Sequence, residues 1–170
     1  MSAFEGYSGY AYSPSGDKGR FALPPTLRKE VRDSSDDNAI LCLAAHEDMD
    51  CLVGFGLSRI PKLHAQLERE EERAIRLGQT DFNPEIRGQQ LFGFERLPFD
   101  ASGRFVMPEY LRDLGQVDSG LFFQGAGDFF FIWNPDVLAT MGSGFKVARA
   151  ACVKLVAEAQ AKAAKKGGSK

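Results

Sequence analysis

Two short turns of the sequence place a glycine directly before an arginine. Lys18, Gly19 and Arg20 lie in the first turn, and Gly103 and Arg104 lie in the second. A glycine lets the backbone approach a phosphate closely, and a guanidinium group can form two hydrogen bonds with the edge of a guanine. A two-stranded ribbon that ends in such a turn fits the major groove of DNA. Both turns therefore have the chemistry of a DNA-reading loop.

A structural role is the alternative for both arginines. Arg20 could pair with Asp17, and Arg104 could pair with Asp100, across the tip of each turn. A single Gly-Arg pair is common in proteins, and by itself it favours this structural role. The occurrence of the same pair in two equivalent turns favours the DNA-binding role.

The residues that most often support catalysis or metal binding lack the spacing that such sites need. Cys42, His46 and Cys51 could be metal ligands, but no fourth candidate stands at the spacing of a zinc site. The two cysteines lie in apolar segments, which favours buried core thiols. His64 lies in a charged segment, and the usual nucleotide-binding and hydrolase motifs are absent. We therefore expect no enzyme activity, cofactor, metal site or small-molecule substrate.

The aromatic run Phe129–Trp133 could be a stacking platform for single-stranded nucleic acid. No polar residue alternates with the apolar ones in this run. A strand of this composition is typically covered on both faces. We expect it to be a central strand of the core or part of a subunit interface.

The composition is that of an ordinary globular protein and excludes wholesale disorder. The chain has 170 residues, of which 44% are hydrophobic and 26% are charged, which fits one domain or two small ones. Three cysteines without a CxxC pair argue against a disulfide framework. No apolar run reaches the roughly 18 residues of a membrane span, and the first residues lack the pattern of a signal peptide. We expect a cytoplasmic protein with no membrane partner.

The charge is unevenly distributed along the chain. The formal net charge is 21 − 23 = −2, which indicates no global attraction to nucleic acid. Residues 17–32 hold five cations and two anions, and residues 33–50 hold six acids and no lysine or arginine. Residues 146–170 hold seven cations and one acid. Any contact with DNA must therefore use local basic patches, whose effect an oligomer would add together.

An internal repeat organises the chain. Gly19–Arg28 aligns with Gly103–Arg112 at an offset of 103 − 19 = 84 residues, and the two segments share Gly, Arg, Phe, Pro, Leu and Arg in the same order. Self-similarity of this kind indicates two copies of one structural unit. A turn rich in glycine, serine and aspartate precedes each copy.

Each copy predicts the same series of elements, which is strand, strand, short helix, strand, strand, with the glycine-rich turn between the first two strands. Short strands are expected at Arg20–Leu23 and Arg104–Met107, because Pro24 and Pro108 then end the ladder and start helices. The further expected elements are helices at Pro25–Val31 and Glu109–Leu114, strands at Ile40–Leu43, Cys51–Phe55, Leu121–Phe123 and Phe129–Trp133, a charged helix capped by Ser58, a helix capped by Asn134, and an alanine-rich helix from Phe145 to Ala164. We expect the residues from Lys165 onward to be a disordered tail.

The order of these motifs resembles that of the MraZ family of bacterial transcriptional regulators. The likeness is carried by Gly16–Pro25, Cys51–Phe55, Asp100–Pro108 and Phe130–Pro135, and it covers about residues 4–141. The resemblance implies an α+β fold in which two tandem AbrB-like swapped-hairpin units form a β-barrel with peripheral helices. On this basis we expect a first unit with its closing helix at 1–80, a second unit at 81–142, and a C-terminal helix with a lysine-rich tail at 143–170.

The resemblance also implies a function and a set of contacts. Such proteins form ring-shaped homo-oligomers on the nucleoid and repress their own division and cell-wall gene cluster by binding direct repeats of double-stranded DNA in its promoter. The positions that match the DNA-binding motifs are Lys18, Gly19, Arg20, Asp100, Gly103 and Arg104. Arg20 is the leading contact. The family's first turn begins with an aspartate four residues before this arginine, but here that position is Gly16 and the acid stands at Asp17.

We therefore expect a sequence-specific DNA-binding repressor. The alternative from another class is an oligomeric scaffold or antitoxin-like interaction module, in which a protein is the partner and the basic loops only keep the chain soluble. Replacement of Arg20 separates the two, because only the first hypothesis requires this side chain for DNA binding.

Overall fold

The computed structural model describes residues 4–14, 16 and 19–168 of the chain. Its strands are β1 (Tyr10–Pro14), β2 (Arg20–Ala22), β3 (Ile40–Ala45), β4 (Leu52–Phe55), β5 (Glu95–Pro98), β6 (Arg104–Val106), β7 (Gly120–Gly125) and β8 (Phe130–Trp133). Its α-helices are α1 (Pro25–Asp33), α2 (Ile60–Arg76), α3 (Pro84–Phe92), α4 (Glu109–Leu114), α5 (Pro135–Leu138) and α6 (Lys146–Gly167). The mixture confirms the expected α+β class.

The two repeats exchange strands within one antiparallel sheet. The order of the six strands is β1-β7-β8-β4-β3-β5, and β2 and β6 form a separate two-stranded ribbon. Strand β1 precedes the first repeat but pairs with β7 of the second, whereas β5 precedes the second repeat but pairs with β3 of the first. The central contact joins β4 of the first repeat to β8 of the second. The two halves therefore interleave.

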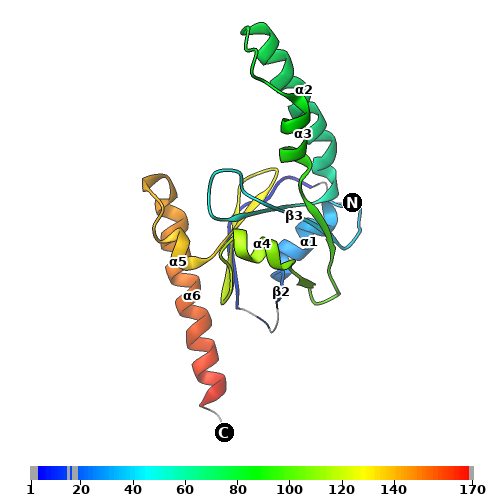
Figure 1. Ribbon diagram of the computed structural model, residues 1–170. Helices are drawn as coiled ribbons and strands as arrows, with labels where there is room; N and C mark the ends of the chain where they lie inside the picture. Colours follow the sequence, from blue (N-terminus) through cyan, green and yellow to red (C-terminus); the bar gives the residue numbers. More distant parts are fainter. Residues whose placement is uncertain (1–3, 15, 17–18, 169–170) are drawn as a thin grey trace.

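The core lies in two apolar clusters. The larger one includes the buried rings of Phe21 and Phe105 beneath the ribbon, and it also takes Leu27 of α1 and Leu111 of α4. The second cluster joins the sheet to α5 and α6. Its buried members are Cys51, Phe122, Trp133, Leu138, Ala148 and Cys152. Figure 1 shows α6 extending past the body at one end, and α2 with α3 extending past it at the other.

The predicted central strand and core cysteines are confirmed. Strand β8 lies between β7 and β4, and Phe130, Ile132 and Trp133 are buried. Cys42 and Cys51 are fully buried. Burial raises the pKa of the Cys42 thiol to about 11 and that of the Cys51 thiol to about 12, so neither is a thiolate at neutral pH. In the described residues no three His, Cys, Asp or Glu side chains gather as a metal site would require.

Two sequence predictions at helix ends are wrong. Ser58 does not cap α2, because it lies in the 3₁₀ turn Leu57–Arg59 and its backbone N–H donates to the carbonyl of Ser34. The predicted tail is helical at its start, since α6 continues through Lys165 and Lys166 to Gly167. Alanine and lysine both favour helix, and the lysines also suit the negative end of the helix dipole. None of the helices in the described part of the chain has the length and apolarity to cross a membrane.

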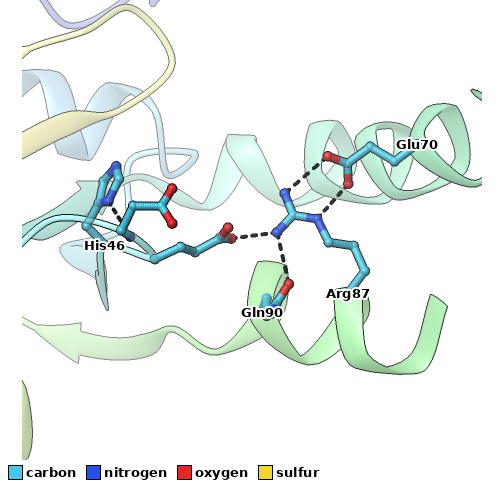
Figure 2. A network of polar contacts seen from close by, with 6 residues as sticks. His46, Glu70, Arg87 and Gln90 are labelled. Atoms are coloured by element: carbon cyan, nitrogen blue, oxygen red, sulfur yellow. Dashed lines mark hydrogen bonds and ion pairs between the residues drawn. The ribbon is translucent and has the colours of Figure 1, made fainter. Parts of the chain in front are cut away.

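Strand β5 is the first strand expected in the second copy, whereas helix α3 was not predicted and is tied to α2 by one arginine. Figure 2 shows Arg87 of α3 between Glu70 of α2 and Gln90 of its own helix. Its Nε and Nη2 donate to the two carboxylate oxygens of Glu70 at 2.7 and 3.2 Å, and Nη1 donates to Glu47 at 2.7 Å. His46 lies on the neighbouring hairpin, and its Nδ1 accepts hydrogen bonds from the backbone N–H groups of Asp48 and Met49. His46 therefore stabilises the turn of its own hairpin.

We expect Arg87→Leu to lower the free energy of unfolding at pH 7 but not in strong acid. The hydrogen bonds from Arg87 lower the pKa of Glu70 below its ordinary 4.5. A carboxyl whose pKa is lower in the folded state stabilises the protein above its unfolded pKa, and this contribution is lost as the pH falls through the folded pKa. Urea unfolding of both proteins at pH 7 and in strong acid, below the folded pKa of Glu70, tests this. An equal difference at both pH values would contradict the pairing.

Candidate nucleic-acid interface

The β2–β6 ribbon carries both predicted arginines on one face. Phe21 pairs with Phe105, and both rings are buried. Their neighbours in each strand point the opposite way, because side chains alternate along a strand. Arg20 and Arg104 are exposed, and the side chain of Arg104 keeps 67% of its surface in solvent. The outer face of the ribbon therefore presents an arginine from each repeat.

An approximate twofold axis relates the two strands of the ribbon. Arg20 pairs with Val106, and Ala22 pairs with Arg104, so the arginines occupy opposite corners of the outer face. The flanking hydrogen bonds follow the same symmetry. The N–H of Leu23 donates to the carbonyl of Gly103 at 2.9 Å, and the N–H of Met107 donates to that of Gly19 at 2.9 Å. These pairs are related by the offset of 103 − 19 = 84 residues, so the repeat found in the sequence is a repeat in space.

Asp100 braces the second turn. Its Oδ1 accepts the backbone N–H groups of Ser102 and Arg104 at 2.9 Å each, and its Oδ2 accepts Nε of Arg104 at 3.0 Å. The hydrogen bond from the Arg104 backbone is the main cause of a pKa below the ordinary value for Asp100, so the carboxylate is charged at neutral pH. The structural pairing considered for Arg104 is therefore present.

The first turn keeps a backbone hydrogen bond of the second, and glycine stands at the position equivalent to Asp100. The N–H of Gly16 donates to the carbonyl of Arg20 at 3.0 Å, as the N–H of Asp100 does to that of Arg104 at 3.0 Å. Gly16 has no side chain, so position 16 cannot brace Arg20 as Asp100 braces Arg104. Lys18, the predicted neighbour of Arg20, lies outside the described residues, as does Asp17.

Two further arginines support the turns, and the sequence analysis missed them as site residues. Arg28 on α1 donates from Nη1 to the carbonyl of Ala101 at 3.0 Å and from Nη2 to that of Leu23 at 3.3 Å. It thus joins the first repeat to the turn of the second. Arg112 on α4 stands against Gly19 in the equivalent place. The signal in the sequence was the alignment itself, because both arginines end the repeated segment.

We expect Gly103→Ala to destabilise the protein more than Gly19→Ala. Both glycines have a left-handed φ, +80° at Gly103 and +76° at Gly19, which costs another residue about 1–3 kcal/mol. A Cβ at Gly103 would also lie 2.6 Å from the backbone carbonyl of Leu23, whereas one at Gly19 would meet the flexible end of Arg112 at 3.0 Å. Thermal unfolding of the two variants measures the difference. Equal losses would contradict the tighter packing of the second turn.

The relatives of the chain are regulators of transcription. No family model matches the chain. It is 30% identical to the transcriptional regulator MraZ of Maridesulfovibrio salexigens, over 75% of this chain and 80% of the relative. It is 29% identical to MraZ of Methylococcus capsulatus, over 69% of this chain and 72% of the relative, and 27% identical to MraZ of Rhodospirillum rubrum, over 71% and 74%.

The interleaved α+β fold with its exposed basic ribbon, together with these relatives, defines a transcriptional regulator. The printed names of the relatives give the class as transcriptional regulator. The chain belongs to the MraZ family.

Proposed function

We propose that the chain is a sequence-specific DNA-binding repressor of a division and cell-wall gene cluster. The observation that carries the proposal is the outer face of the β2–β6 ribbon, on which each repeat presents one exposed arginine. A two-stranded ribbon fits the width of the major groove, and arginine is the side chain that most often reads guanine. The twofold arrangement gives the two arginines equivalent poses toward one duplex.

Arg20 is the leading base-reading residue in this proposal. Arg104 is held at Nε by Asp100, and this ion pair fixes its orientation. Position 16 offers no such carboxylate to Arg20. We propose that Arg20, with Lys18 beside it and Gly19 allowing close approach, reads the bases, and that Asp100, Gly103 and Arg104 form the second, more rigid contact. Glycine at both turns keeps the backbone close to the phosphates.

The finer architecture is also part of the proposal. The exchange of β1 and β5 between the repeats supports two AbrB-like swapped-hairpin units, and the ribbon that spans both repeats supports a barrel-like closure of the sheet. We keep the division into a first unit with its helix at 1–80, a second unit at 81–142 and a C-terminal segment at 143–170. Because strands are exchanged, these segments are repeat units rather than independently folding domains.

We further propose a ring-shaped homo-oligomer that binds direct repeats in its own promoter and is associated with the nucleoid. Exposed apolar side chains outside the ribbon support self-association, since they gain from burial in an interface. In the described part of the chain they are Tyr10, Ile75, Leu77, Ile86, Tyr110, Leu114, Val147 and Val153. A cyclic ring presents successive ribbons in one orientation, so it prefers direct repeats, whereas an isolated twofold dimer prefers a palindrome.

A footprint on the region upstream of the chain's own gene, combined with sedimentation of the free protein, tests this function. The proposal expects several evenly spaced protected segments of the same orientation and an oligomer larger than a dimer. One protected palindrome, with a protein that sediments as a dimer, would refute the ring. No protection at all would refute specific DNA binding.

A further inference from the structure

The last turns of α6 leave the body of the protein. At its start the helix packs Ala148 and Cys152 into the second apolar cluster, with Leu155 and Val156 partly buried beside them. Every residue from Gln160 to Gly168 is exposed. Figure 1 shows this part of α6 extending beyond the sheet. We call residues 160–168 the overhang, and none of them belongs to either apolar cluster.

Lysines replace the apolar residues on the same face of the helix where the body ends. Residues seven apart share one face of an α-helix. Ala148 and Leu155 contact the cluster, and Lys162 is the next residue in their row. Cys152 and Ala159 precede Lys166 in a second row. The face that packs on the sheet thus continues as a cationic face, and Lys165 lies in the same last turns.

The overhang lies at the end of the molecule where the ribbon is found. Figure 1 shows α6 pointing past the body on the side of β2, away from the end at which α2 and α3 extend. Strand β1, which leads toward the first turn, packs against α6 through Tyr12. A duplex held on the outer face of the ribbon could therefore extend toward the overhang, which at about 1.5 Å per residue reaches roughly 13 Å.

The positive charge of the overhang favours a strongly anionic partner. From Gln160 to Gly168 it holds Lys162, Lys165 and Lys166 and no acid. The charged helix α2 of a second copy is a poor match, because its four glutamates stand among three arginines and one lysine. Alanines between the lysines offer little surface for specific contact with a protein. DNA phosphates match the positive charge, and contact with them does not require a specifically shaped protein surface.

We propose that Lys162, Lys165 and Lys166 form a phosphate-binding arm that contacts the DNA backbone beside the site read by the ribbon. This inference rests on the proposed function. Phosphate contacts position a protein on the duplex without reading its sequence. Each neutralised phosphate steepens the dependence of log affinity on log salt by about 0.9. The arm therefore strengthens binding to every duplex by the same factor.

The test compares the wild-type chain with the triple variant Lys162→Gln, Lys165→Gln, Lys166→Gln. Fluorescence anisotropy measures binding to a duplex from the chain's own upstream region and to a scrambled duplex, between 50 and 200 mM salt. We expect the slope to flatten by about 2.7, so that over this range the wild type loses about 40-fold more affinity than the variant. The ratio of the two affinities stays the same.

Two matched controls separate charge from other effects. The triple Lys→Arg variant keeps the charge and should keep the wild-type slope. Lys62→Gln removes a cation in the first turn of α2, where Lys62 pairs with Asp128 of the β7–β8 turn at 2.6 Å. It should leave the slope unchanged. Glutamine has nearly the helix propensity of lysine, so circular dichroism should show α6 intact in the triple variant.

The failures of the two proposals are distinguishable. An unchanged slope in the triple variant, with the wild type still preferring its own duplex, refutes the arm and leaves the function standing. A flatter slope with no preference for either duplex supports the arm and refutes sequence-specific regulation. A changed sedimentation coefficient with an unchanged slope shows that the lysines contact a second copy, which also refutes the arm.

Discussion

Replacement of Arg20 by alanine is expected to abolish the preference of the protein for its own upstream DNA while leaving its melting temperature unchanged. Arg20 lies at an exposed corner of the β2–β6 ribbon, so its removal leaves no cavity in the core. A guanidinium that reads guanine contributes about 1–3 kcal/mol of discrimination, or roughly 5- to 150-fold for each base contact. In an oligomer the loss is multiplied over the bound subunits.

Arg104→Ala is the matched control, because it removes the same side chain from the other repeat. It also removes the ion pair with Asp100, so we expect a smaller loss of discrimination and a less rigid second turn. Electrophoretic mobility shifts with specific and competitor DNA measure the discrimination, and size-exclusion chromatography measures the assembly. If Arg20→Ala disrupts the oligomer or lowers the melting temperature by several degrees, Arg20 is a structural residue.

The second large effect is expected from Trp133→Ala. Trp133 is fully buried at the end of β8, its indole N–H donates to Gln124 at 3.1 Å, and its ring meets that of Phe145 edge-on at 5.5 Å. Removal of a buried tryptophan side chain costs about 3–5 kcal/mol of unfolding free energy, because the surrounding side chains refill the cavity only in part. The loss falls on the cluster that attaches α6.

Trp133→Phe is the control for this prediction. It keeps an aromatic ring in the cluster and removes the hydrogen bond to Gln124, so we expect a much smaller loss. Denaturant unfolding followed by circular dichroism measures both variants, since Trp133 is the single tryptophan of the chain and its own fluorescence is lost. A loss below about 1 kcal/mol in Trp133→Ala would contradict its position in the core.

The two copies of the repeat could be predicted from the sequence because their signals are local. The ribbon could not, because β2 pairs with β6 of the other copy and not within a hairpin of its own copy, as the turns predicted. A glycine with a left-handed φ, a short strand and a helix-starting proline recur in the same order around Phe21 and Phe105. The exchange of β1 and β5 could not be predicted in this way. Two similar repeats offer each strand two similar partners, and the choice depends on how both halves pack together.

The elements that were missed or left without bounds have weak local patterns. Strand β5 is an edge strand with one partner, and its Glu95, Arg96 and Pro98 are typical of loops. Helix α3 begins with the cap Asn83 and with Pro84, which is a recognisable start, but Gly88 and its polar neighbours obscure the helical period. Its place is fixed by the long-range pairing of Arg87 with Glu70, which no local pattern contains.

The candidate site was predicted at the level of the turns but not of their supports. The pairing of Asp100 with Arg104, which the sequence offered as the structural alternative for this arginine, is present. Arg28 was not expected at the turn of the other repeat, because a contact with Ala101 across 73 residues is a property of the folded pair. Placement of Lys18 and of the base contacts of Arg20 stays a prediction.

The most direct test of sequence-specific DNA binding is an anisotropy titration of the wild-type chain with a labelled duplex from its own upstream region and with a scrambled duplex, each at low and at high salt. As the salt concentration rises, phosphate contacts weaken equally on both duplexes. Base contacts form only with the native duplex and depend little on the salt concentration. We predict tight binding to the native duplex whose preference over the scrambled one persists at high salt. Weak binding that is equal for both duplexes and is lost at high salt would contradict the account.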